Sequence, residues 1–117
     1  MKAAKILLAA VLLLLAAHST AFAYDNLKML NSTGNTIFFV YLAPSSSKSW
    51  GSDRLSGVWQ NGNTLTLNVP KHRYWDLKIV FKGGAKAEFT KGIDTTQVYM
   101  LTITRNNEGG YTLHYNS

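Results

Sequence analysis

Apolar and polar residues alternate along most of the chain after residue 23, in short runs separated by clusters of Gly, Asn and Ser. A period of two predicts half-buried β-strands, and no segment of useful length has the helical period. The predicted strands cover residues 26–31, 36–43, 64–69, 74–82, 85–90, 97–105 and 111–116. The expected fold class is therefore all-β, an antiparallel two-sheet β-sandwich of about seven strands.

The longest irregular stretch covers residues 45–63. Connections of this length are usually functional or folded on themselves. Because the stretch carries Trp50 and Trp59, we expect it to pack against the sandwich, with one helical turn at residues 52–55 and with Trp50 contributing more to stability than Trp59. The preceding strand, residues 36–43, is apolar on both faces and is expected to be central and buried.

The hairpin that follows Phe81 can be fixed from the faces of its strands. Paired residues share a face, so Phe81 has to lie opposite an inward residue such as Ala85. A three-residue connection at 82–84 satisfies this condition and also pairs Lys78 with Glu88, an attractive pair. The other connection that parity allows sets two lysines opposite each other. We therefore predict the three-residue connection.

The first 23 residues have the pattern of a signal peptide. A start with two lysines is followed by an unbroken apolar run from Ile6 to Ala17 and by a small-x-small sequence at 21–23. The run is shorter than the ~20 residues of a membrane-spanning helix. We therefore expect residues 1–23 to be removed and residues 24–117 to form a single exported domain, in the periplasm or outside the cell, with no transmembrane segment.

Charge and composition narrow the classes of function. The formal charge of +6 falls to +4 once the two N-terminal lysines are removed, which favours anionic partners but lacks the clustered basic residues of a nucleic-acid site. The chain has no cysteine and no Gly-x-Ser-x-Gly motif, and Asp53, Asp76 and Asp94 follow no calcium-loop pattern. We expect a non-enzymatic protein with no catalytic residue, metal or cofactor; whether the three aspartates converge is left open.

Aromatic residues in predicted loops and at strand ends give a binding function its best support. The rings of Trp50, Trp59 and Tyr74 either stack on sugars or fold inward. Lys71 and Arg73 belong to the densest basic run, which either attracts an anion or is a solvated loop. These five are the candidate ligand-binding residues, and the expected partner is an anionic or glycan component of the cell envelope. The alternative is a protein-interaction module, an accessory or inhibitor of a secreted protein, that uses an exposed strand edge.

Several motifs of this sequence occur together in one known group of proteins. They are T-I-x3-Y-x2-P-S at residues 36–45, S-W-G-x-D-x-L-x-G at 49–57 and D-L-K at 76–78. On these motifs the chain resembles, over residues 31–104, a group of small exported bacterial proteins without an assigned activity. It departs from them in having Trp75 where tyrosine is usual and in lacking the cysteines of some members. The resemblance implies export and a small β-sandwich, and no particular activity.

Overall fold

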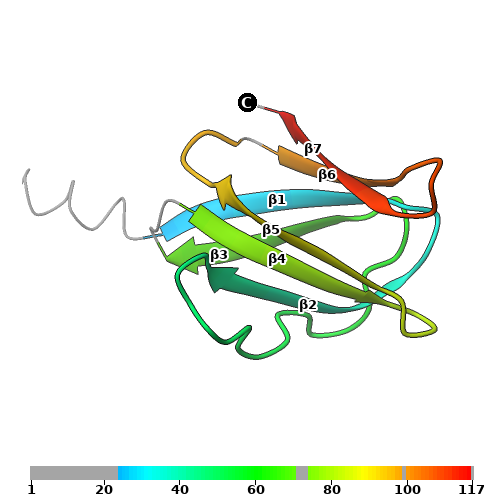
Figure 1. Cartoon of the computed structure of the whole chain (residues 1–117), viewed down its shortest axis with the longest axis horizontal. Coiled ribbons are helices and arrows are strands. Elements are labelled where there is room, and N and C mark those ends of the chain that lie inside the picture. The colour runs from blue at the N-terminus through cyan, green and yellow to red at the C-terminus, as the bar shows by residue number, and fades with distance from the viewer. Residues whose placement is uncertain (1–23, 71–73, 99, 117) are drawn as a thin grey trace, which may run out of the picture.

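The computed structural model describes residues 24–70, 74–98 and 100–116. Seven strands form two facing sheets (Figure 1). The four-stranded sheet has the order β3-β1-β6-β7 and the three-stranded sheet the order β2-β4-β5. The strands are β1 (Tyr24–Ser32), β2 (Ile37–Pro44), β3 (Thr64–Pro70), β4 (Tyr74–Phe81), β5 (Lys86–Asp94), β6 (Met100–Arg105) and β7 (Tyr111–Asn116). The predicted all-β sandwich of seven strands is confirmed, and the described residues include no helix long and apolar enough to cross a membrane.

Strand pairing is antiparallel throughout the two sheets except between β1 and β6. These two strands run parallel, with Met29 beside Leu101 and Asn31 beside Ile103. Parallel neighbours cannot be joined by a tight hairpin and need a long connection. The chain supplies it by passing through β2, β3, β4 and β5 before β6 returns to lie beside β1. The sheets are thus mostly antiparallel, as expected, and the β1–β6 pair is the exception among the described strands.

The core lies between the sheets and is built from alternate residues of each strand. In β4 the inward side chains are all nearly inaccessible, as the period of two predicts. Burying a large apolar side chain contributes about 1.5–3 kcal/mol, so this layer supplies most of the cohesion of a domain that has no disulfide. The most deeply buried side chains are Leu27, Met29, Ile37, Val40, Leu42, Val69, Leu77, Ile79, Phe81, Ile93, Leu101 and Ile103.

The hairpin between β4 and β5 has the predicted register. Lys78 lies opposite Glu88. The main-chain N–H of Phe81 donates to the carbonyl of Ala85 at 2.8 Å, which closes the three-residue connection 82–84. Face parity was sufficient here because the inward residues of both strands are apolar.

Strand β2 lies at the edge of its sheet, and the prediction that it would be central was wrong. Its apolar character has another cause, because the loop of residues 45–63 runs along its free side. Ile37 and Trp59 exchange two main-chain hydrogen bonds of 2.9 Å. Further along the strand, the main-chain N–H of Arg54 donates to the carbonyl of Val40 at 2.7 Å. The loop therefore closes an edge that would otherwise be open to strand addition.

The same loop contains no helical turn in the structure, contrary to the prediction for residues 52–55. Asp53 organises the segment instead, since its Oδ1 accepts hydrogen bonds from the main-chain N–H groups of Leu55 and Val40 at 3.0 and 2.9 Å. A side chain that satisfies two amides competes well with a helical turn. Between residues 50 and 57, Leu55 rather than Trp50 packs against the core cluster, to which Trp59 further along the loop belongs.

Candidate binding site between strands β5 and β7

The structure describes three of the five residues proposed as ligand contacts, and these three share no hollow. Trp59 is 3% exposed and its indole N–H donates to the carbonyl of Asn63 at 2.7 Å, so its ring offers no face to a ligand. Trp50 is half-buried and lines a hollow of about 130 Å³ together with the end of β2 and Asp76 of β4. Tyr74 is 42% exposed at the start of β4. Lys71 and Arg73 lie outside the described residues.

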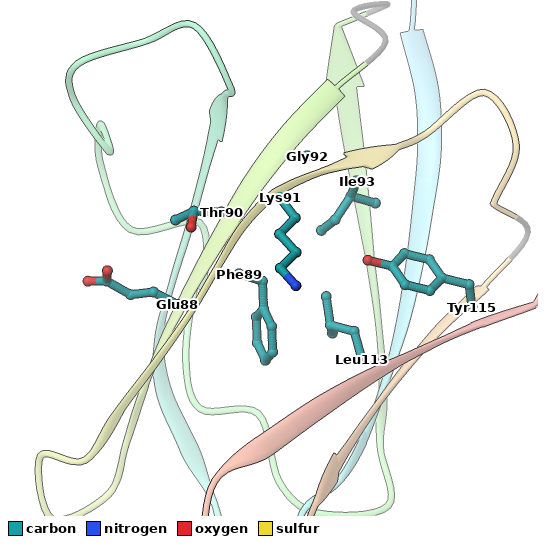
Figure 2. A pocket seen from close by; sticks show the side chains of 8 residues that line it. All are labelled: Glu88, Phe89, Thr90, Lys91, Gly92, Ile93, Leu113 and Tyr115. Atoms are coloured by element: carbon teal, nitrogen blue, oxygen red, sulfur yellow. The ribbon is translucent and has the colours of Figure 1, made fainter.

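Another hollow, larger than the one beside Trp50, lies where β5 and β7 form neighbouring edges of the two sheets. Its volume is about 250 Å³. Phe89, Lys91 and Ile93 approach it from β5, and Leu113 and Tyr115 approach it from β7 (Figure 2). One sheet has four strands and the other three, which leaves the inner face of β7 only partly covered. We call this hollow the β5–β7 opening.

The walls of the β5–β7 opening are mostly apolar, and two polar groups, the Lys91 ammonium group and the Tyr115 hydroxyl, extend into it. Figure 2 shows the Lys91 side chain extending from β5 toward the space between Phe89 and Leu113, with the Tyr115 hydroxyl directed into the opening from the other side. Glu88 and Thr90 point away from it. Lys91 has no carboxylate partner within the described part of the chain. Lys91 is exposed, so its ammonium group is accessible to an anion at the mouth of the opening.

A bulge in β5 gives the opening its shape. Leu77 pairs with Phe89, but the next pair is Trp75 with Ile93, so β5 has two residues more than β4 in this interval. An even number of extra residues keeps Phe89, Lys91 and Ile93 on the inward side. Gly92 makes the bulge possible, since it has a φ of +81°.

The bulge also connects Tyr74 to the opening. A Cβ on Gly92 would lie 3.4 Å from both the Tyr74 Cβ and the Ser45 Oγ, so the bare glycine lets these side chains pack against β5. Tyr74, Ser45 and Lys91 line a second, shallower hollow of about 270 Å³. Lys91 and Gly92 belong to both hollows. Of the three sequence-based candidates that the structure describes, Tyr74 is the one next to the opening.

The residues of the opening were missed because the strand was expected to end at Thr90. Extended by one residue, the alternation places Lys91 on the inward face shared by Ala87 and Phe89, and a charge at an inward position is the clue that was available. Leu113 and Tyr115 lie on the inner face of the last strand and looked like ordinary core residues. That they face an opening follows from how the two sheets are stacked.

The three aspartates lie in separate local hydrogen-bond arrangements. Asp53 binds the β2 edge, Asp76 accepts a bond from Ser45 Oγ at 2.8 Å, and Asp94 accepts bonds from the N–H and hydroxyl of Thr96. Among the described residues no three metal-binding side chains come together. His114 is exposed on the outer face of β7 and lies 2.8 Å from the Thr104 hydroxyl.

Comparison with known proteins supports the fold and leaves the function open. No family model matches the sequence, and no curated protein matches it significantly. Among solved structures, the chain is similar to a protein from Eubacterium rectale whose structure was determined by NMR. The TM-score is 0.59 at 9% identity, over 81% of this chain and 90% of the other. At that identity the likeness concerns the arrangement of strands alone.

Proposed function

We propose that this chain is an exported, non-enzymatic binding protein whose ligand enters the β5–β7 opening. The observation that supports this function is the position of Lys91, an ammonium group without a carboxylate partner in the described chain, between apolar walls at the open side of the sandwich. Lys91 is exposed, so its ammonium group is accessible to an anionic ligand whose apolar part packs on the walls of the opening. Export follows from the signal-peptide pattern of residues 1–23.

The chemistry of the opening favours an anionic ligand that also has an apolar part. The anionic group would lie at Lys91, within reach of the Tyr115 hydroxyl, and the apolar part would pack on Phe89 and Leu113. The charge of +4 left after removal of the signal peptide would steer anions toward the protein. The second hollow, with Tyr74 and Ser45, would accommodate a hydroxylated group such as a sugar.

Titration with three octyl compounds tests this function. Octyl phosphate, octyl glucoside and octyltrimethylammonium share one apolar chain and differ in the charge of the head group. We expect octyl phosphate to bind most tightly and to shift the amide NMR signals of β5 and β7. Lys91→Gln should weaken octyl phosphate binding by about 10-fold or more, since a hydrogen bond to a charged group contributes about 1.5–3 kcal/mol.

Lys86→Gln is the matched control, because Lys86 lies on the same strand with an exposed side chain on the outward parity and does not line the opening. It removes the same charge from the protein and should leave binding within about twofold. Equal binding of octyl phosphate to the original protein and to Lys91→Gln contradicts the proposed site. A preference for octyl glucoside, independent of Lys91, would indicate a glycan ligand held without the ammonium group.

A second candidate function is that of a protein-interaction module, an accessory or inhibitor of a secreted protein. One observation favours it, namely that β7 is an edge strand whose inner side chains line the opening. An edge strand offers main-chain groups that a small amphiphile does not use.

A further inference from the structure

We propose that the natural ligand of the β5–β7 opening is an extended peptide segment of a partner protein, which adds to β7 as a further strand and places an acidic side chain at Lys91. This inference rests on the proposed binding site and names the class of its ligand. Three features support it: the outward direction of the main-chain groups of alternate β7 residues, the lack of protective residues along the β7 edge, and the positive charge of Lys91 at the opening.

The hairpin that joins β7 to β6 determines which residues of β7 direct their main-chain N–H and C=O groups away from β6. The Asn106 N–H donates to the Gly110 carbonyl at 2.9 Å, so these two residues form a hydrogen-bonded pair. Bonded and non-bonded pairs alternate along an antiparallel ladder. Leu113, paired with Ile103, is therefore in a non-bonded pair, and so are Tyr111 and Tyr115. The main-chain N–H and C=O groups of these three residues point to the free edge of β7.

The edge of β7 lacks the features that protect other edges of this protein. The register between β6 and β7 is unbroken over all its pairs, and β7 contains no proline, glycine, lysine or carboxylate. The β2 edge is covered by the loop of residues 45–63. The β5 edge is bulged and carries Lys86 and Glu88 on its exposed side. Bulges and charges discourage strand addition, so β7 is the more receptive side of the opening.

A strand added to β7 would direct alternate side chains into the opening. The peptide residues paired with Leu113 and Tyr115 share the inward face of those residues. An apolar side chain opposite Leu113 would pack on Leu113 and Phe89. The inward side chain opposite Tyr115 lies toward Lys91, whose positive charge favours a carboxylate there. The segment recognised would thus carry an apolar and an acidic residue separated by one residue.

Charge complementarity distinguishes this occupant from a second copy of the chain. The sequence of β7, YTLHYN, contains no acidic residue, so a symmetric β7 pair would leave both Lys91 side chains without a counter-charge. The basic charge of the protein also disfavours self-association. A partner segment with a carboxylate satisfies both the edge and the ammonium group.

The test uses a blocked peptide, Ser-Thr-Glu-Thr-Ile-Thr-Ser, which would pair antiparallel with β7 and place Ile opposite Leu113 and Glu opposite Tyr115. In the proposed pose the Ile and Glu amides bond to β7, while the amide of the Thr between them points away. We expect the amides of residues 111, 113 and 115 to gain protection from hydrogen exchange on binding, whereas those of residues 112 and 114, already bonded to β6, should change little. N-methylation of the Ile amide should weaken binding by about 10-fold, and N-methylation of the central Thr should change it by less than about threefold.

The Glu→Gln peptide should bind the original protein about as weakly as the Glu peptide binds Lys91→Gln. Equal effects of the two N-methylations would overturn strand addition. If octyl phosphate binds at Lys91 but the peptide does not, the peptide inference fails and the proposed site stands; if neither depends on Lys91, both fail. Protection of residues 111, 113 and 115 that rises with protein concentration alone would identify a second copy as the occupant and overturn the inference.

Discussion

The rings of Phe81 in β4 and Tyr111 in β7 stack with their centroids 4.4 Å apart and their planes at 20°. The pair joins the middle strand of one sheet to the edge strand of the other. Phe81 is 1% exposed, so the contact is part of the core. It therefore anchors the start of β7, the strand that forms one side of the β5–β7 opening.

Replacing Phe81 by Ala should lower the free energy of unfolding by about 3–5 kcal/mol, since it removes a buried ring and the stacking contact that this ring makes with Tyr111. Urea denaturation measures the loss. Glu88→Lys, in the same hairpin, is the comparison; it should cost well under ~1 kcal/mol because exposed cross-strand charge pairs are weak. Equally mild effects of the two changes would contradict the inward position of Phe81.

Asp53→Ala should destabilise the protein by about 1–3 kcal/mol, because it leaves the main-chain N–H groups of Val40 and Leu55 without their acceptor. Asp53→Asn keeps an acceptor oxygen at the same place and should cost less. Urea denaturation of both variants separates the hydrogen bonds from the charge. If Asn proved as damaging as Ala, the negative charge rather than the acceptor would hold the loop on β2.

The two loop tryptophans should differ in the opposite order to the one expected from the sequence. Trp59→Ala removes a ring that is 3% exposed and should cost about 3–5 kcal/mol. Trp50→Ala removes a half-buried ring outside the core cluster and should cost less. Melting temperatures of the two variants test this order. A larger drop for Trp50→Ala would mean that its ring is better packed than its exposure indicates.

Gly92→Ala should cost about 1–3 kcal/mol, because a side chain is strained at φ +81° and its Cβ would press on Tyr74 and Ser45. Gly57→Ala is the matched control, since its Cβ would meet nothing within 4 Å and its φ lies outside the positive range. Thermal unfolding should show little change or a slight gain for Gly57→Ala. A neutral Gly92→Ala would show that the bulge relaxes without cost.

Export should leave Tyr24 at the N-terminus of the mature protein. Intact-mass measurement of the protein recovered from the periplasm or the medium checks this. Ala23→Leu should slow processing, because the cleavage site requires a small residue at that position. Recovery of the full chain with Met1 in the membrane fraction would contradict soluble export.

The strands and one register were determined by the sequence alone. The alternation around Leu77 and Phe81 identified β4 and its inward face, and parity then identified the 82–84 connection. Both are local consequences of the two-residue period of a strand, which holds whatever the neighbours are. Prediction of the hairpin therefore needed no knowledge of the other sheet.

The order of strands within each sheet, and with it the opening, was decided only by tertiary structure. The apolar sequence of β2 reads the same whether a strand or a loop covers its edge, and here the loop does so through Asp53 and Trp59. Leu113 and Tyr115 likewise read as core residues, yet they line an opening because the facing sheet ends at β5. The period along a strand shows which side chains face inward. Whether the opposite sheet covers those side chains depends on the stacking of the sheets, which the period does not reveal.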